Sequence, residues 1–80
     1  MSLSKARILY YNGRHGSALE QLKKVKDRTA QVLEISGLIK LEIGDLSGAL
    51  RDFEEAIRIE PTEDLLLYRR KTLERGGLRT

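Results

Sequence analysis

Residues 30–63, with the sequence AQVLEISGLIKLEIGDLSGALRDFEEAIRIEPTE, carry the strongest structural signal in this chain. Gly44 and Asp45 divide the stretch, and Pro61 lies near its end. Between Asp45 and Pro61 the apolar residues recur at intervals of three and four, which predicts an amphipathic helix with Asp45 as its N-cap. These residues are Leu46, Ala49, Leu50, Phe53, Ala56 and Ile57.

The residues before Gly44 predict another helix, which begins after Thr29 as its N-cap. Its apolar residues cover much of the helix circumference, which is typical of a helix flanked by neighbours on several sides. They are Val32, Leu33, Ile35, Leu38, Ile39, Leu41 and Ile43. The stretch therefore predicts two helices joined by a tight turn at Gly44.

Toward the N-terminus the spacing predicts two more helices. The first covers residues 3–11 and stops at the Asn-Gly pair that follows. The second is predicted to begin at Ser17, because Ser17 and Glu20 have the spacing of a capping box, and to end near residues 27–28.

A fifth helix is predicted on the C-terminal side of Pro61. Thr62 is its expected N-cap, acidic residues occupy its first turn, and it runs to about Arg75 before two glycines. Residues 77–80 are expected to form a frayed tail. The chain is thus predicted to be all-α, with about five helices and no strand.

Length and composition restrict the kinds of protein this can be. Eighty residues make a single domain, since compact domains are typically about 50–250 residues long. With no Cys and one His, the chain cannot form a disulfide, a thiolate zinc site or a metal site with two imidazoles. The N-terminus lacks the features of a secretory signal, and the longest apolar run, residues 65–68, is far shorter than the roughly 20 residues of a membrane-spanning helix. We therefore expect a cytoplasmic protein without a cofactor.

The chain also contains an internal repeat. The pattern Gly13-x4-Ala18-Leu19-x2-Leu22 recurs 31 residues later as Gly44-x4-Ala49-Leu50-x2-Phe53. Self-similar helix pairs at a fixed period are the mark of a solenoid, in which each pair leaves an apolar face that its neighbour covers.

Residues 30–63 resemble a tetratricopeptide repeat (TPR) over a 34-residue unit. The matching residues, at the spacing of the family, are Leu33, Gly37, Gly44, Asp45, Ala49, Phe53, Ala56 and Pro61. Ser36 and Lys40 depart from the family pattern, which usually has leucine and tyrosine there. The resemblance implies that the small residues Gly37, Ala49 and Ala56 allow close helix approach, and that Phe53 fills the gap toward the next unit.

The resemblance implies a fold of antiparallel helix pairs stacked as a short right-handed TPR-like solenoid. Residues 1–29 would be a degenerate first pair, residues 30–63 the best-matching repeat, and residues 64–76 a closing helix. The first helix of each pair then lines a concave groove. The groove residues carried over from the family are Arg7, Tyr10, Tyr11, Gln31, Glu34, Leu38, Leu41, Glu42, Leu65, Tyr68 and Thr72.

This resemblance predicts a non-enzymatic protein–protein interaction module, such as an adaptor, scaffold or co-chaperone, that binds a protein or peptide segment or a second copy of itself. Family members that hold a peptide C-terminal carboxylate use an asparagine at the position of Ile35 here. A carboxylate clamp is therefore not expected. A helix or an extended apolar segment is the better expected ligand.

A catalytic site is not predicted from the sequence. His15 is expected to be a solvated turn residue, and the capping box already accounts for Ser17. Glu54 and Glu55 are neighbours on a helix, so their side chains diverge by about 100° and cannot converge on one substrate atom. An enzyme remains conceivable only if this chain is part of something larger.

Charge distribution raises an alternative function. The net charge is +5 over residues 1–29, −6 over residues 30–64 and +4 over residues 65–80. The last segment could bind an anionic membrane or a nucleic acid through its basic residues, Arg69, Arg70, Lys71, Arg75 and Arg79. Nucleic acid is disfavoured, because the acidic middle would interrupt a continuous path for phosphates. Most of these charges are expected to lie on solvated helix faces.

Overall fold

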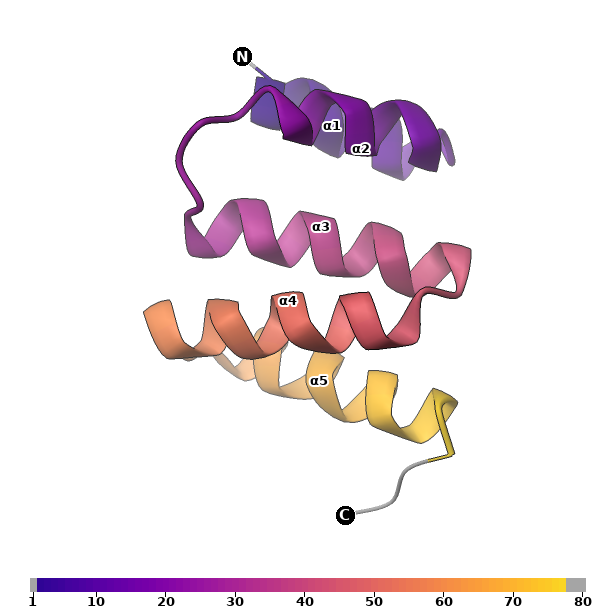
Figure 1. The fold of residues 1–80 in the computed structure, drawn as a ribbon, viewed down its shortest axis with the longest axis vertical. Coiled ribbons are helices and arrows are strands. Elements are labelled where there is room, and N and C mark those ends of the chain that lie inside the picture. The colour runs from indigo at the N-terminus through magenta and orange to yellow at the C-terminus, as the bar shows by residue number, and fades with distance from the viewer. Residues whose placement is uncertain (1, 78–80) are drawn as a thin grey trace.

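The computed structural model describes residues 2–77 of the chain and shows five helices, with no strand in that range. Figure 1 shows them as α1 (Ser2–Tyr11), α2 (His15–Lys23), α3 (Ala30–Ile43), α4 (Leu46–Ile59) and α5 (Glu63–Arg75). The predicted all-α class is confirmed. The predicted tail lies, apart from Gly77, outside the described residues.

Three predicted N-caps are present. The side chain of Thr29 accepts a hydrogen bond from the backbone N–H of Val32, and Thr62 accepts one from Leu65. Asp45 caps α4 by accepting from the backbone N–H of Gly48. Each cap satisfies a backbone donor that the first turn of a helix leaves without a partner.

The turn between α3 and α4 depends on a left-handed residue. Gly44 has a φ of 89°, and the N–H of Asp45 donates to the carbonyl of Lys40 at 2.8 Å. Because only glycine adopts this conformation without steric cost, Gly44 ends α3 and reverses the chain within two residues.

The predicted bounds of α2 are wrong at both ends. The helix begins at His15, its N-cap Arg14 makes no side-chain capping bond, and Ser17 lies within the first turn, so the Ser17–Glu20 capping box does not form. The tight turn after α1, closed by the Arg14 N–H to the Leu9 carbonyl at 2.8 Å, lets the helix start earlier. At the other end, the backbone N–H groups of residues 24 and 25 donate to the carbonyls three residues before them, as in a 3₁₀-helix, which tightens the last turn. Residues 24–29 then form a linker to α3.

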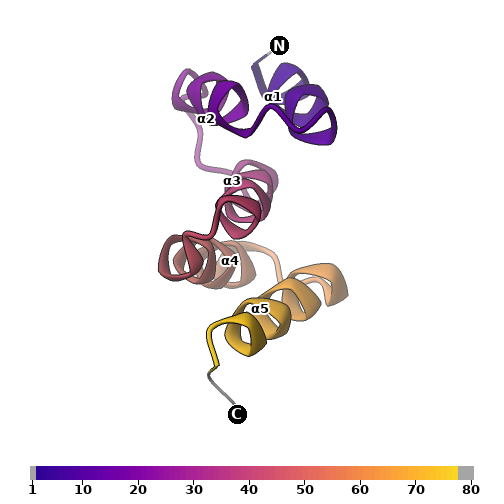
Figure 2. The same cartoon turned by 90° about the vertical axis from the view of Figure 1, so that its right-hand side faces the viewer.

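The helices stack along the long axis of the molecule, which measures 37 × 24 × 17 Å. Helices α1 and α2 form one antiparallel hairpin, α3 and α4 form a second, and α5 packs against α4 (Figures 1 and 2). Viewed end-on in Figure 2, α1, α3 and α5 lie toward one side, with α3 set back between the other two, while α2 and α4 lie toward the opposite side.

The core consists of two apolar clusters that share α3. One lies among α1, α2 and α3 around Ala6, Ala18 and Ile39. The other lies among α3, α4 and α5 around Leu33 and Phe53. Half-buried apolar side chains pack against each cluster, and Leu38 packs against both of them. The two hairpins are therefore coupled through α3.

Candidate interaction surface

Helices α1, α3 and α5 together form one face of the molecule, called here the odd-helix face (Figure 2). Helix α1 contributes Arg7, Tyr10 and Tyr11, whose spacing of three and four residues places them on one side of the helix. Tyr11 is the most open of them, at 73% exposed, and its ring lies 5.4 Å from that of Tyr10. This face therefore carries aromatic area that solvent can reach.

Side chains from all three helices act on one another across the odd-helix face. Burial raises the pKa of the Tyr10 phenol, and the negative charge of Glu42 on α3 raises it further. Burial likewise raises the pKa of Tyr68 on α5, with further contributions from Asp64 and Glu34. In each case one of the acting carboxylates belongs to α3, which lies between α1 and α5 (Figure 2).

Glu34 lies near the middle of this face and is half-buried. Burial raises the pKa of its carboxyl group above the ordinary value, and the nearby charges of Asp64 and Glu60 act in the same direction. Arg7 on α1 opposes them by favouring the ionised form. The surface around Glu34 thus has a surplus of carboxylates.

A hollow of about 180 Å³ marks the acidic end of the face, between the starts of α3 and α5. Three carboxylates, Glu34, Glu60 and Asp64, line it, together with the apolar side chains of Ala30 and Leu65. A cationic side chain flanked by apolar groups would fit this chemistry.

Three of the predicted groove residues do not offer their side chains to a ligand. Leu41, Leu65 and Thr72 are buried among the helices, each at 6% exposed or less, and the Thr72 hydroxyl donates to the Tyr68 carbonyl at 2.8 Å. Helix α5 therefore presents Tyr68, rather than its neighbours a turn away, to the odd-helix face. Leu38 is half-buried between the two core clusters.

Of the residues named for repeat packing, Gly44 and Pro61 are exposed, whereas the other four lie in close contact between helices. Ala49, Phe53 and Ala56 are fully buried, and a Cβ atom built on Gly37 would lie 2.5 Å from the Phe53 ring. Gly37 is thus the point at which α3 admits the aromatic ring of α4.

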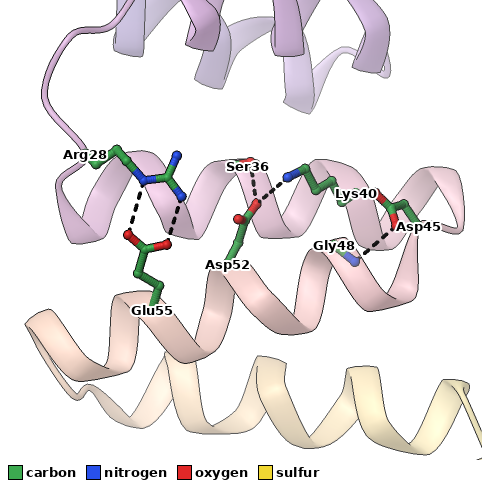
Figure 3. Close-up of polar contacts among 7 residues, drawn as sticks. All are labelled: Arg28, Ser36, Lys40, Asp45, Gly48, Asp52 and Glu55. Atoms are coloured by element: carbon green, nitrogen blue, oxygen red, sulfur yellow. Dashed lines mark hydrogen bonds and ion pairs between the residues drawn. The ribbon is translucent and has the colours of Figure 1, made fainter.

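A polar cluster that the sequence analysis did not identify joins α3 to α4 (Figure 3). The buried Asp52 carboxylate accepts a hydrogen bond from the Ser36 hydroxyl at 2.5 Å and pairs with the Lys40 ammonium at 2.9 Å. Ser36 and Lys40 are the two departures from the TPR pattern, and they have one partner in common. The signal was present, because Asp52 falls on the apolar stripe of Ala49, Phe53 and Ala56.

Two arginine contacts were also missed. Arg28, in the linker before α3, binds the Glu55 carboxylate of α4 with two hydrogen bonds of 3.1 and 2.8 Å (Figure 3). Arg75, at the end of α5, donates to the Leu41 carbonyl at 3.2 Å in the last turn of α3, and the same carbonyl accepts from the Gly44 N–H at 3.3 Å. Both contacts join segments more than 25 residues apart in sequence, so the local sequence pattern does not contain them.

A second hollow, of about 370 Å³, lies between α2 and α3. Its apolar floor includes Leu19 and Val32, and cationic side chains at its edge are Lys23, Arg28 and Lys40. Since Arg28 and Lys40 are paired with carboxylates, this hollow has little unpaired positive charge to offer an anion.

His15 differs from the expectation of a solvated turn residue. It is the first residue of α2, is half-buried, and its ring lies 5.7 Å from that of Tyr10. Ser17 is exposed. Among residues 2–77, three or more His, Cys, Asp or Glu side chains nowhere come together as a cluster that could hold a metal ion. None of the helices in that range combines the length and apolar character needed to cross a bilayer.

Comparison with protein-family models, curated proteins and solved structures finds no match to this chain.

Proposed function

We propose that this chain is a non-enzymatic protein–protein interaction module of TPR-like design, which binds a segment of a partner protein on its odd-helix face. The observation that carries the proposal is that α1, α3 and α5 lie toward one side of the molecule (Figure 2) and carry partly accessible aromatic and acidic side chains. Tyr11 is 73% exposed, and Tyr10, Glu34 and Tyr68 are half-buried. Aromatic side chains are favoured at interfaces because they supply large contact area with few rotatable bonds.

The proposed ligand is a segment with apolar side chains and at least one Lys or Arg. Its apolar groups would contact the tyrosines and Leu38, which is half-buried. Its cation would lie near Glu34 and the acidic hollow, where carboxylates outnumber the single nearby Arg7. Charge complementarity of this kind sets orientation and association rate more than total affinity.

The alternative, a basic C-terminal surface for an anionic membrane or a nucleic acid, has less support. Arg69 pairs with Glu54 at 3.3 Å, and Arg75 donates to the Leu41 carbonyl. Two of the five basic residues are thus engaged within the fold, and Arg79 lies outside the described residues. What remains of the basic helix surface is Arg70 and Lys71.

A peptide-display selection followed by isothermal titration tests the proposal. We expect the selected peptides to combine apolar residues with Lys or Arg, and we expect Tyr11→Ser and Glu34→Lys each to weaken binding by about tenfold, which is 1.4 kcal/mol. The controls, Ile59→Ser on α4 and Glu20→Lys on α2, remove an exposed apolar side chain and reverse an exposed charge on helices outside this face, and they should leave affinity unchanged.

Three results would count against the proposed surface. Failure of the selection to return any binding peptide is the first. Equal weakening by the control variants is the second. The third is tight binding to nucleic acid or anionic vesicles, with a dissociation constant that rises steeply with salt, together with weak binding of the peptides. That result would favour the alternative function.

A further inference from the structure

The outer face of α5 points away from the rest of the molecule and is apolar at its centre. Leu66 and Leu67 are 51% and 37% exposed, although both lie in the middle of a helix. Glu63, Arg70 and Leu73 continue the same stripe at intervals of three and four residues. Together with Arg69 these side chains line a shallow hollow of about 360 Å³.

The corresponding face of α3 shows what such a stripe does in this fold. Thr29 and Thr62 are both N-caps, so α3 and α5 align with an offset of 33 residues. In this alignment the buried residues Val32 and Ile39 of α3 match Leu65 and Thr72 of α5, which are also buried.

On the adjacent stripe, the α3 residues that contact α4 match the exposed residues of α5. Leu33 and Gly37 on α3 correspond to Leu66 and Arg70. The outer stripe of α5 is therefore the position at which α3 receives its hairpin partner. Within residues 2–77 no helix follows α5 to cover it.

The occupant of this stripe must differ in chemistry from α4. Gly37 admits the Phe53 ring at contact distance, whereas the matching position of α5 carries Arg70, which has a long, charged and exposed side chain. A covering helix therefore has to bring a carboxylate opposite Arg70 and apolar side chains opposite Leu66 and Leu67.

Helix α5 itself has that chemistry when a second α5 lies antiparallel to it. Its stripe begins with Glu63, is apolar at Leu66 and Leu67, and then continues to Arg70. Reversing the direction of the helix brings Glu63 of one copy opposite Arg70 of the other, twice, with the leucine pairs between them. A parallel arrangement would instead place like charges together. Neither Glu63 nor Arg70 takes part in an ion pair within the described part of the chain.

We propose that two copies of this chain associate through the outer faces of α5, antiparallel about a twofold axis that passes between Leu66 and Leu67. The leucines form the apolar centre of the interface, and the two Glu63–Arg70 pairs flank it. The residues that line this surface are not among those proposed to contact the partner segment, so the proposal does not depend on that segment.

Charge reversal with complementation tests this arrangement by sedimentation equilibrium of the full chain. The wild-type chain is expected to show a concentration-dependent dimer. Glu63→Arg and Arg70→Glu should each weaken dimerisation by at least about tenfold, because one substitution in a twofold interface acts twice. When the two variants are mixed, the introduced arginine of one chain faces the introduced glutamate of the other, and the native Arg70 faces the native Glu63. The mixture should therefore regain dimer at close to the wild-type concentration.

Two controls separate the interface from folding. Ile43→Ser removes an equally exposed apolar residue at the end of α3 and should leave the dimer intact, whereas Leu66→Ser should weaken it. Circular dichroism of each single variant checks that the helices are retained. The mixing experiment also controls for folding, because two variant chains that had lost their structure could not regain the dimer when mixed.

A wild-type chain that stays monomeric up to about millimolar concentration overturns the proposal, as does a mixture of the two charge variants that dimerises no better than either alone. Weakening by Ile43→Ser as strong as that by Leu66→Ser would move the interface away from α5 and also overturn it.

Discussion

Gly37 and Phe53 show how one missing side chain determines the distance between two helices. The ring of Phe53 is fully buried and occupies the space where a Cβ atom on residue 37 would be. Glycine in the middle of a helix ordinarily costs about 1 kcal/mol relative to alanine. Its presence in α3 is therefore explained by packing against α4 and not by helix propensity.

Gly37→Ala is expected to lower the free energy of unfolding by about 1–3 kcal/mol, because a buried ring has to move to admit the methyl group. Gly16→Ala in α2 is the matched variant, since nothing lies within 4 Å of its Cβ position. That change should be neutral or stabilising by up to about 1 kcal/mol. Urea unfolding measures both, and an equal effect of the two alanines would contradict the proposed contact.

Asp52 is a second residue whose contribution to the stability of the fold depends on its surroundings. Its side chain is 5% exposed and that of Lys40 28%, so the pair is closer to a buried ion pair than to a surface one. The mutual attraction of such a pair offsets the cost of removing two charges from water only while both partners are present.

Lys40→Met is expected to destabilise the fold by roughly 1–3 kcal/mol, since Asp52 then keeps only the Ser36 hydroxyl as a partner. Lys40→Met combined with Asp52→Leu should regain most of the loss, because replacing a whole buried pair by apolar residues is often neutral or better. Lys26→Met, an exposed lysine outside any ion pair in the described residues, serves as the control. A double variant as unstable as Lys40→Met alone would show that Asp52 is needed for another reason.

At the scale of elements, the helix ends were predicted better than the helix-to-helix contacts. Thr29, Asp45 and Thr62 are N-caps because a hydroxyl or carboxylate at that position satisfies backbone donors nearby in sequence, so local sequence was sufficient. The Asn-Gly pair marked the turn after α1, but the start of α2 was missed because that turn is tight enough for the helix to begin at His15, before the expected capping box. The contacts of Arg28 and Arg75 were missed because they depend on how α3, α4 and α5 are arranged.

The candidate site was only partly predictable. Helical spacing together with the resemblance named Arg7, Tyr10, Tyr11, Glu34 and Tyr68 for one face, and their role in binding stays a prediction. It could not tell which side chains one turn away would be covered, because burial of Leu65 and Thr72 depends on the angle at which α5 meets α3 and α4. That angle is set by tertiary packing and not by the spacing within α5.

Glu55 and Glu34 give the pH dependence of stability opposite signs. The hydrogen bonds from Arg28 lower the pKa of Glu55 in the folded state below the ordinary value of 4.5. Ionised Glu55 therefore stabilises the fold above pH 4.5, and this stabilisation is lost as the pH falls through the lower pKa of the folded state. Burial instead raises the pKa of Glu34 in the folded state, so ionised Glu34 opposes folding at neutral pH.

Glu34→Gln is accordingly expected to raise the midpoint of thermal unfolding at pH 7, and the gain should shrink as the pH falls and wild-type Glu34 becomes protonated. Glu55→Gln should lower the midpoint at pH 7 and lose its effect in acid. Carboxyl carbon chemical shifts measured by NMR between pH 2 and 7 report the two groups directly. Glu55 titrating above Glu34 would contradict both assignments.

At the scale of the whole molecule, two core clusters share a single helix, α3. The cluster around Phe53 is enclosed by α3, α4 and α5, whereas the cluster around Ala6 depends on α1 and on α2, which has only nine residues and no side-chain N-cap. Local opening is expected where fewer apolar contacts and fewer satisfied helix ends hold the backbone.

Hydrogen exchange is therefore expected to show two levels of protection, with the amides of α3 and α4 exchanging at least tenfold more slowly than those of α1 and α2. Leu38→Ala should widen the difference, because Leu38 packs against both clusters and couples them. Mass spectrometry of peptic fragments measures this. Uniform protection over the five helices would show that the chain opens only as one unit.

The polar cluster at Asp52 has a consequence for how the second hairpin can assemble. Ser36 and Lys40 are one helical turn apart, and the carboxylate lies between them. Sliding α4 along α3 by one turn would bring it beside Val32 or Gly44 instead, and so deprive it of either the ammonium or the hydroxyl. We expect the cluster to favour this alignment of α3 and α4, because a hairpin shifted by one turn would leave the Asp52 carboxylate with one partner fewer.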